Sequence, residues 1–170
     1  GLGDVYKRQP PGVGRAMTYT LLIDGYSGAG KTTLAEQIGG ALRIRVVNLD
    51  DFYPGWGGLA EGARMVADDV LALENPGYWR WDWEKNKRGD WVPLDPGEDL
   101  VVEGVGAITE ASISKARARG SVDTLRVTAD AATRRARALR RDPGYAEFWD
   151  MWAEQERRHP AISVDVVVRR

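Results

Sequence analysis

The chain has 170 residues, of which 43% are hydrophobic and 29% charged, so its length suits one folded domain and its composition is not that of a disordered chain. Lys plus Arg (24) nearly balance Asp plus Glu (25), and the net charge of -1 gives no reason to expect a nucleic-acid or membrane partner. The absence of cysteine excludes disulfides, thiolate metal sites and a cysteine nucleophile, and it is consistent with a cytoplasmic protein.

The N-terminal segment differs from the rest of the chain. Residues 1–9 show neither helical nor strand periodicity, and they resemble the translated adaptor sequence that gene-fragment assembly leaves behind. We therefore interpret residues 1–16 as a non-native or disordered leader. Residues 17–170 are expected to form a single domain.

From Thr18 onward, short apolar runs alternate with helix-like segments. Runs rich in Leu, Ile and Val predict buried parallel strands at 19–24, 44–50, 100–103, 125–128 and 164–168. Helices are predicted at 31–41, 59–73, 106–119, 131–141 and 145–159, with Gly120 ending the third of them as a C′ glycine. This order predicts an α/β fold: a central parallel sheet with helices on both faces. Residues 54–96 interrupt the alternation and are predicted to form an insertion that carries the acceptor site.

A phosphate-binding motif follows the first predicted strand. Residues 25–32 fit G-x-x-x-x-G-K-[ST] at every fixed position and lead into a predicted helix. The glycines let successive backbone N–H groups converge on phosphate oxygens, and the helix N-terminus adds partial positive charge. Lys31 is expected to bridge the β- and γ-phosphates, and Thr32 to place its hydroxyl on Mg²⁺. The predicted nucleotide-binding residues are Gly25, Ser27, Gly28, Ala29, Gly30, Lys31, Thr32 and Thr33.

This motif by itself does not distinguish kinases from GTPases or ATPase motors, because all three classes carry it. The chain shows no base-reading N-K-x-D segment of the GTPase type, and it is short for a motor. A compact small-molecule kinase fits its length.

Two predicted strands end in carboxylates, Asp50 and Glu103. The carboxyl ends of strands line the binding crevice of an open α/β sheet, so both side chains are expected to face the γ-phosphate. One can accept the proton of an attacking hydroxyl, and the other can hold Mg²⁺ directly or through water. Asp51 fits a capping role equally well.

Arginines and tryptophans form two further patterns. On the predicted helix 131–141, Arg134, Arg137 and Arg141 share one face, whereas Arg135 and Arg140 point elsewhere; residues 130–144 are therefore interpreted as an arginine-rich lid. Alternation along a strand would place the tryptophans at positions 79, 81 and 83 on one side, either as an acceptor wall or as cover for the sheet edge. The tryptophans at 149 and 152 have the spacing of buried helix positions.

Taken in order, these segments resemble the uridine kinase group of P-loop kinases. The shared features are the phosphate motif, Asp-Asp-Phe-Tyr at 50–53, Trp-Asp-Trp at 81–83, Glu-Gly at 103–104, the arginine-rich segment 130–142 and Val-Asp-Val-Val-Val at 164–168. The resemblance implies a three-layer P-loop NTPase fold with strand order 2-3-1-4-5. It also implies ATP and Mg²⁺ as cofactors, and transfer of the γ-phosphoryl group to a hydroxyl of a small acceptor. The acceptor that the resemblance favours is a nucleoside.

The resemblance also implies roles for individual residues. Asp50 would be the general base, assisted by Lys31, Arg134 and Arg137 around the phosphates. Thr32, Glu103 and Asp50 would serve Mg²⁺. Tyr53, Trp81, Asp82 and Asn86 would contact the acceptor, with Asn86 standing where uridine- and cytidine-phosphorylating members carry histidine.

Two other functions remain open at this point. A nucleoside monophosphate kinase would need cations in its acceptor pocket, and the insertion offers Arg64, Arg80, Lys85, Lys87 and Arg88. A regulatory module would bind the nucleotide and turn nothing over. The expected partner is a small-molecule acceptor; an oligomer is possible, but no sequence feature supports it.

Overall fold

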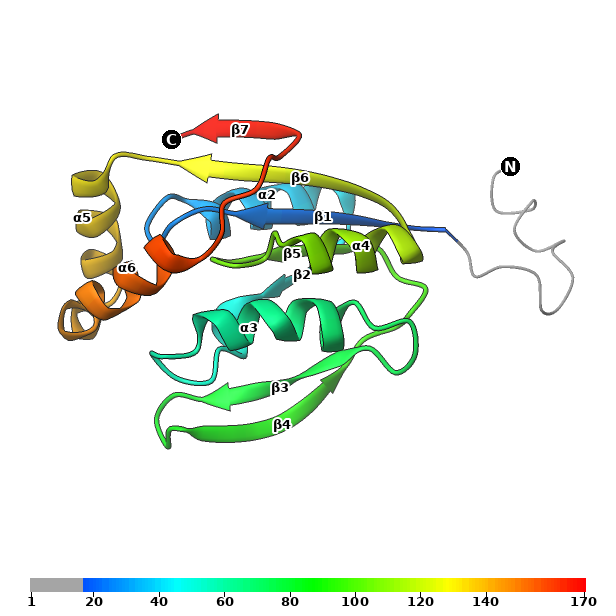
Figure 1. The fold of residues 1–170 in the computed structure, drawn as a ribbon, viewed down its shortest axis with the longest axis horizontal. Helices are drawn as coiled ribbons and strands as arrows, with labels where there is room; N and C mark the ends of the chain where they lie inside the picture. The colour runs from blue at the N-terminus through cyan, green and yellow to red at the C-terminus, as the bar shows by residue number, and fades with distance from the viewer. Residues whose placement is uncertain (1–16) are drawn as a thin grey trace, which may run out of the picture.

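The computed structural model describes residues 17–170, so the interpretation of residues 1–16 as a leader lies outside the described residues. A five-stranded parallel sheet with the order β2-β5-β1-β6-β7 forms the centre (Figure 1). Its strands are β1 (Thr18–Asp24), β2 (Arg45–Asn48), β5 (Leu100–Glu103), β6 (Gly120–Thr128) and β7 (Val166–Arg169). Numbered along the chain without the separate hairpin, this is the predicted order 2-3-1-4-5.

Helices cover both faces of the sheet (Figure 1). They are α2 (Lys31–Leu42) on one face, and α3 (Leu59–Met65) and α4 (Glu110–Arg119) on the other, where α6 (Trp149–Arg158) adds its tryptophans to the same core. Leu21 and Ile23 of β1 enter the core under α2, while Leu22 between them enters the opposite core, as the two-residue period of a strand requires. The predicted three-layer α/β fold is therefore confirmed. No helix within residues 17–170 combines the length and apolar character of a membrane span.

The C-terminal helices lie beyond the carboxyl end of the sheet. Helix α5 (Ala131–Arg141) follows β6 and is joined to α6 by the 3₁₀ turn η3 (Pro143–Glu147) (Figure 1). The predicted helix 145–159 is therefore a 3₁₀ turn followed by a shorter α-helix. The side chain of Asp142 accepts a hydrogen bond from the backbone N–H of Gly144 at 3.0 Å, which favours a tight turn at this point.

The predicted insertion contains a hairpin that the sequence did not reveal. Strands β3 (Gly77–Asp82) and β4 (Lys87–Pro93) pair antiparallel, at the side of the molecule where α3 lies (Figure 1). The Lys, Arg, Gly and Asp residues that begin β4 show no apolar alternation, which explains why it was missed. The helix predicted at 59–73 is α3 continued by the π-helical segment η2 (Val66–Val70).

Two predictions around α4 need correction. The helix begins at Glu110 rather than at 106, because Thr109 and Ser112 form a capping box there. Gly120 is not a left-handed C′ glycine: its φ is 163°, and it is the first residue of β6. A Cβ atom at Gly120 would lie 2.0 Å from the carbonyl oxygen of Thr18, so the glycine permits the close approach of β1 and β6.

Candidate active site

The phosphate loop connects β1 to α2, as predicted. Its backbone turns through Gly28 at φ 78° and Gly30 at φ 101°, values that L side chains rarely adopt. A Cβ atom at Gly28 would also lie 2.0 Å from the carbonyl oxygen of Arg134. Glycine is therefore required there both for the turn and for the close packing of α5 against the loop.

A buried carboxylate at the end of β1 holds the loop in place. Asp24 accepts hydrogen bonds from the backbone N–H groups of Gly25 at 2.7 Å, Gly106 at 3.2 Å and Ile108 at 3.0 Å. The phosphate loop and the loop that follows β5 are thus fastened to one side chain. The sequence offered one signal for this residue, a carboxylate directly after an apolar strand.

Lys31, Thr32 and Glu103 lie together beneath the loop. The Lys31 ammonium donates to the carbonyl oxygen of Tyr26 at 3.1 Å, and the Thr32 hydroxyl donates to a carboxylate oxygen of Glu103 at 2.8 Å. Glu103 is 1% exposed, and this burial raises its pKa to about 7, although Lys31 and the Thr32 hydrogen bond act in the opposite direction. The structure brings these three predicted residues together.

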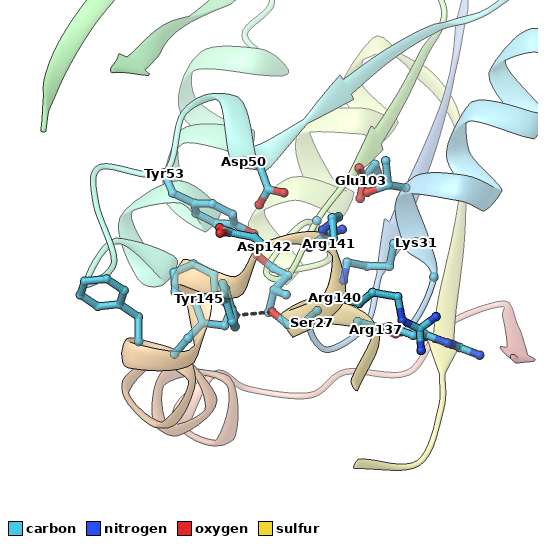
Figure 2. Close-up of a pocket in the computed structure, with 18 of the residues that line it drawn as sticks. Ser27, Lys31, Asp50, Tyr53, Glu103, Arg137, Arg140, Arg141, Asp142 and Tyr145 are labelled. Carbon is cyan, nitrogen blue, oxygen red and sulfur yellow. Dashed lines mark hydrogen bonds between the residues drawn. The ribbon is translucent and has the colours of Figure 1, made fainter. Parts of the chain in front are cut away.

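Asp50 projects from the 3₁₀ turn η1 (Leu49–Asp51) that follows β2. The side chain of Asn48 accepts from its backbone N–H, and the indole N–H of Trp83 donates to its carbonyl oxygen, both at 2.8 Å. These bonds fix the backbone and leave the carboxylate facing the cavity together with Lys31 and Glu103 (Figure 2). The neighbouring Asp51 is not among the cavity-lining residues, and burial raises its pKa.

One cavity of about 780 Å³ joins the phosphate loop to an aromatic surface. Its polar end is lined by Ser27, Gly28, Gly30, Lys31, Thr32, Thr33, Asp50 and Glu103. Its aromatic end is lined by Tyr53, Trp56, Trp83, Tyr145, Phe148 and Trp152. The predicted loop residues Gly25 and Ala29 shape the loop without lining the cavity.

The arginines of α5 divide into two groups. Arg137, Arg140 and Arg141 line the cavity, whereas Arg134 donates to the carbonyl oxygen of Ser27 at 3.4 Å and lies over the Tyr26 ring. The expectation that Arg140 points away is therefore wrong. Position 140 is three residues and position 141 four residues after position 137. The last turn of α5 therefore presents all three arginines to the same side.

Trp56 is the centre of the aromatic end. Its ring stacks on Phe148 with centroids 4.6 Å apart, meets Tyr145 edge-on at 4.8 Å and contacts Trp83 at 5.2 Å. Its carbonyl oxygen accepts a hydrogen bond from the side-chain amide of Gln155 at 2.6 Å. Sequence reasoning missed Trp56, Tyr145 and Phe148 because they belong to separate loops and turns and share no periodicity.

Of the four predicted acceptor contacts, only Tyr53 lines the cavity, and its hydroxyl is occupied by the carbonyl oxygen of Val105 at 2.5 Å. Trp81 instead lines a second, smaller hollow. Asp82, the last residue of β3, accepts from the backbone N–H of Lys85 at 2.9 Å, and Asn86 lies in the hairpin turn with φ 50°. These three residues do not line the cavity, and their acceptor role stays a prediction.

The alternation of the tryptophans ends with β3. Trp79 and Trp81 line the second hollow together, and the register shift between them lies in β4, where two residues oppose Arg80 alone. Trp83, just past the end of β3, is the member of the Trp-Asp-Trp segment that reaches the cavity. Trp149 and Trp152 are buried, as predicted, and Trp152 also closes the floor of the aromatic end.

The chain has the α/β fold of P-loop kinases, as comparison with solved structures shows. A possible uridine kinase from Bacillus stearothermophilus is 21% identical, with 98% of this chain and 95% of that chain covered and a TM-score of 0.52. A putative fructose transport system kinase from Silicibacter sp. TM1040 is 15% identical, with coverage of 97% and 95% and a TM-score of 0.56.

The APS kinase of Mycobacterium tuberculosis, solved in complex with AMPPNP and APS, is 18% identical, with 91% of this chain and 89% of that chain covered and a TM-score of 0.51. No protein-family model and no curated protein sequence matches the chain. At these identities the likeness concerns the fold, and the chemistry has to be argued from the site.

Proposed function

We propose that this protein is a kinase that transfers the γ-phosphoryl group of ATP to a hydroxyl of a small, uncharged acceptor, with a nucleoside as the first candidate. The observation that carries the proposal is the single cavity in which the phosphate loop, the Asp50 carboxylate and an aromatic surface meet. A phosphate donor and a flat acceptor bound at its two ends would place the acceptor hydroxyl near Asp50.

Each polar group has a task in this reaction. The loop N–H groups and Lys31 hold the triphosphate, and the three cavity-lining arginines of α5 stabilise charge on the transferring group. The acceptor oxygen forms a bond to the γ-phosphorus, and the bond from that phosphorus to the β–γ bridging oxygen breaks, which releases ADP. Asp50 accepts the proton that the acceptor hydroxyl loses.

The residues around Thr32 fit a magnesium ion. The Thr32 hydroxyl and the carboxylates of Glu103 and Asp50 are hard oxygen donors, which Mg²⁺ prefers. The negative charge of Asp50 contributes to the raised pKa of Glu103, and a cation between them would relieve this repulsion. Bound with ATP, Mg²⁺ would neutralise charge on the phosphates.

The surroundings of the cavity favour an uncharged acceptor over a nucleoside monophosphate. None of the five cations of the insertion that could bind an acceptor phosphate lines the cavity. Arg64 is paired with Glu61 and Asp68, and Arg88 lies over the Trp79 ring at 4.6 Å. The aromatic end offers flat apolar faces, which suit a planar ring.

A screen for ADP release tests this proposal. Mg·ATP is mixed with the protein and with nucleosides, nucleoside monophosphates, sugars or other alcohols in turn, with the Asp50→Asn variant as the inactive control. The expected result is release of ADP that depends on an uncharged acceptor. Turnover with monophosphates only would contradict the choice of acceptor, and ATP binding without any acceptor-dependent turnover would favour a regulatory module.

A further inference from the structure

Ser27 of the phosphate loop is bonded to three elements near the C-terminus, namely α5, η3 and α6. The backbone N–H of Ser27 donates to a Glu156 carboxylate oxygen of α6 at 2.8 Å, and its hydroxyl shares a hydrogen bond with the Tyr145 hydroxyl of η3 at 2.9 Å (Figure 2). Its carbonyl oxygen accepts from Arg134 of α5. Ser27, Tyr145 and Glu156 are all buried, so these bonds form away from competing water.

The same elements also hold the aromatic end of the cavity. Tyr145 packs its ring edge-on against Trp56 at 4.8 Å. Gln155, the neighbour of Glu156 on α6, donates to the Trp56 carbonyl oxygen at 2.6 Å and accepts from the backbone N–H of Leu59 at 3.3 Å. A short physical chain therefore runs from the phosphate loop through η3 and α6 to the segment 55–59.

Tyr145 spans this chain by itself. Its hydroxyl bonds to Ser27 of the phosphate loop, and its ring packs against Trp56 of the aromatic end, so one side chain contacts both. A triphosphate in the loop would restrict the motion of Ser27, and through Tyr145 it would also restrict segment 55–59. An acceptor that binds afterwards would then not have to order that segment itself. By reciprocity, an acceptor on the aromatic end would then strengthen nucleotide binding.

We propose that Tyr145 is a positioning residue that couples the phosphate loop to the aromatic end, so that nucleotide binding orders the segment 55–59 and prepares it for the acceptor. The proposal rests on the proposed function in one respect, since it requires a nucleotide in the loop. It does not depend on which acceptor is used.

Hydrogen–deuterium exchange tests the coupling, with AMPPNP and Mg²⁺ as the probe. In the unmodified protein, saturating AMPPNP is expected to slow amide exchange in segment 55–59 by about twofold to tenfold, the range that one hydrogen bond supports. The Tyr145→Phe variant keeps the ring and loses the hydroxyl. It should bind AMPPNP within about threefold of the unmodified protein and lose most of the nucleotide-dependent slowing.

Two further variants separate coupling from a structural effect. Tyr19→Phe removes a hydroxyl that donates to Asp123 at 2.9 Å on β6, outside this chain of contacts, and should behave as the unmodified protein. Ser27→Ala, measured at saturation, should reduce the slowing as much as Tyr145→Phe does. The double variant should add nothing, because both substitutions remove the same bond.

The possible outcomes separate this inference from the proposed function. If Tyr145→Phe raises exchange equally with and without AMPPNP, the residue is merely structural and the inference is overturned. Binding of AMPPNP without any change in segment 55–59 of the unmodified protein also overturns it, while the proposed function stands. Failure of the unmodified protein to bind AMPPNP overturns both.

Discussion

The two ends of the cavity are built in different ways. At the polar end, the loop N–H groups, Lys31 at the start of α2 and the carboxylates at the edge of the sheet lie beside the arginines of α5, and Lys31 and Glu103 are 8% and 1% exposed. At the aromatic end, the rings come from separate segments, and Trp83 is 39% exposed. The polar end thus depends mostly on main-chain and strand geometry, whereas the aromatic end depends on how side chains pack. Substitutions of its rings are therefore expected to change acceptor preference more than reaction chemistry.

The largest expected effect of a single substitution concerns Asp50. Asp50→Asn should lower kcat by about 10²- to 10⁴-fold, because an amide cannot accept the acceptor's proton, while AMPPNP affinity stays nearly unchanged. Steady-state kinetics and calorimetry measure the two quantities. Asp51→Asn, one residue away and outside the cavity lining, is the matched control and should be close to the unmodified protein. An equal loss of binding and turnover in Asp50→Asn would make that residue structural.

Glu103 links the polar end to the pH dependence of stability. Its pKa in the folded protein, about 7, lies above the ordinary 4.5, so its contribution to stability is fully present below the lower value and is lost as the pH rises through the higher one. The free energy of unfolding of the unmodified protein should fall by about 3 kcal/mol over this range relative to Glu103→Gln. Urea denaturation without divalent cations measures the difference.

A matched substitution checks that this pH dependence belongs to the buried site. Glu36→Gln replaces an exposed carboxyl on α2, so its stability should follow the unmodified protein at every pH. If the free energies of unfolding of Glu103→Gln and the unmodified protein change with pH in parallel, burial does not raise the pKa of the Glu103 carboxyl.

Lys31 tests the assignment of the phosphate loop. Lys31→Ala should weaken AMPPNP binding by about 10- to 100-fold, the range for losing one hydrogen-bonded charge. Lys115→Ala removes an exposed ammonium from α4 and serves as the control in the same calorimetric titration. An unchanged affinity of Lys31→Ala for AMPPNP would contradict the proposal that the phosphate loop binds the triphosphate.

The smallest effect belongs to the aromatic end and compares two tryptophans. Trp83→Ala should raise the KM of the acceptor by about 5- to 100-fold, the range that stacking on one ring supports, while the KM of ATP changes little. Trp81→Ala, which alters the second hollow, should change the acceptor KM by less than about threefold. A larger effect from Trp81 would restore the acceptor role that the family resemblance implies for it.

The sheet and the polar end could be predicted because both follow from local patterns. The motif at 25–32 specifies a turn between a strand and a helix whatever the rest of the chain does. Glu103 ends β5, and Asp50 lies in the turn after the neighbouring parallel strand β2, so topology brings both to one edge. The order β2-β5-β1-β6-β7 agrees with the one that the family resemblance implies, and no local pattern specifies it.

The aromatic end could not be predicted because it depends on contacts between distant segments. Nothing local to Trp56 indicates that Phe148 stacks on it. The register shift between β3 and β4 is likewise a property of their pairing, and the charged sequence of β4 hid that strand. The resemblance therefore points to the Trp-Asp-Trp segment, but it does not indicate that Trp83 is the member that lines the cavity.

Asp24 has a practical consequence for anyone who wishes to redirect this protein. Its carboxylate accepts from three backbone N–H groups, so an asparagine there would turn its own NH₂ toward donors and loosen two loops at once. A directed-evolution library should hold position 24 constant. It can diversify positions 56 and 148, which supply rings to the aromatic end, in a search for new acceptors, while Trp83 is kept because its indole N–H donates to the carbonyl oxygen of Asp50.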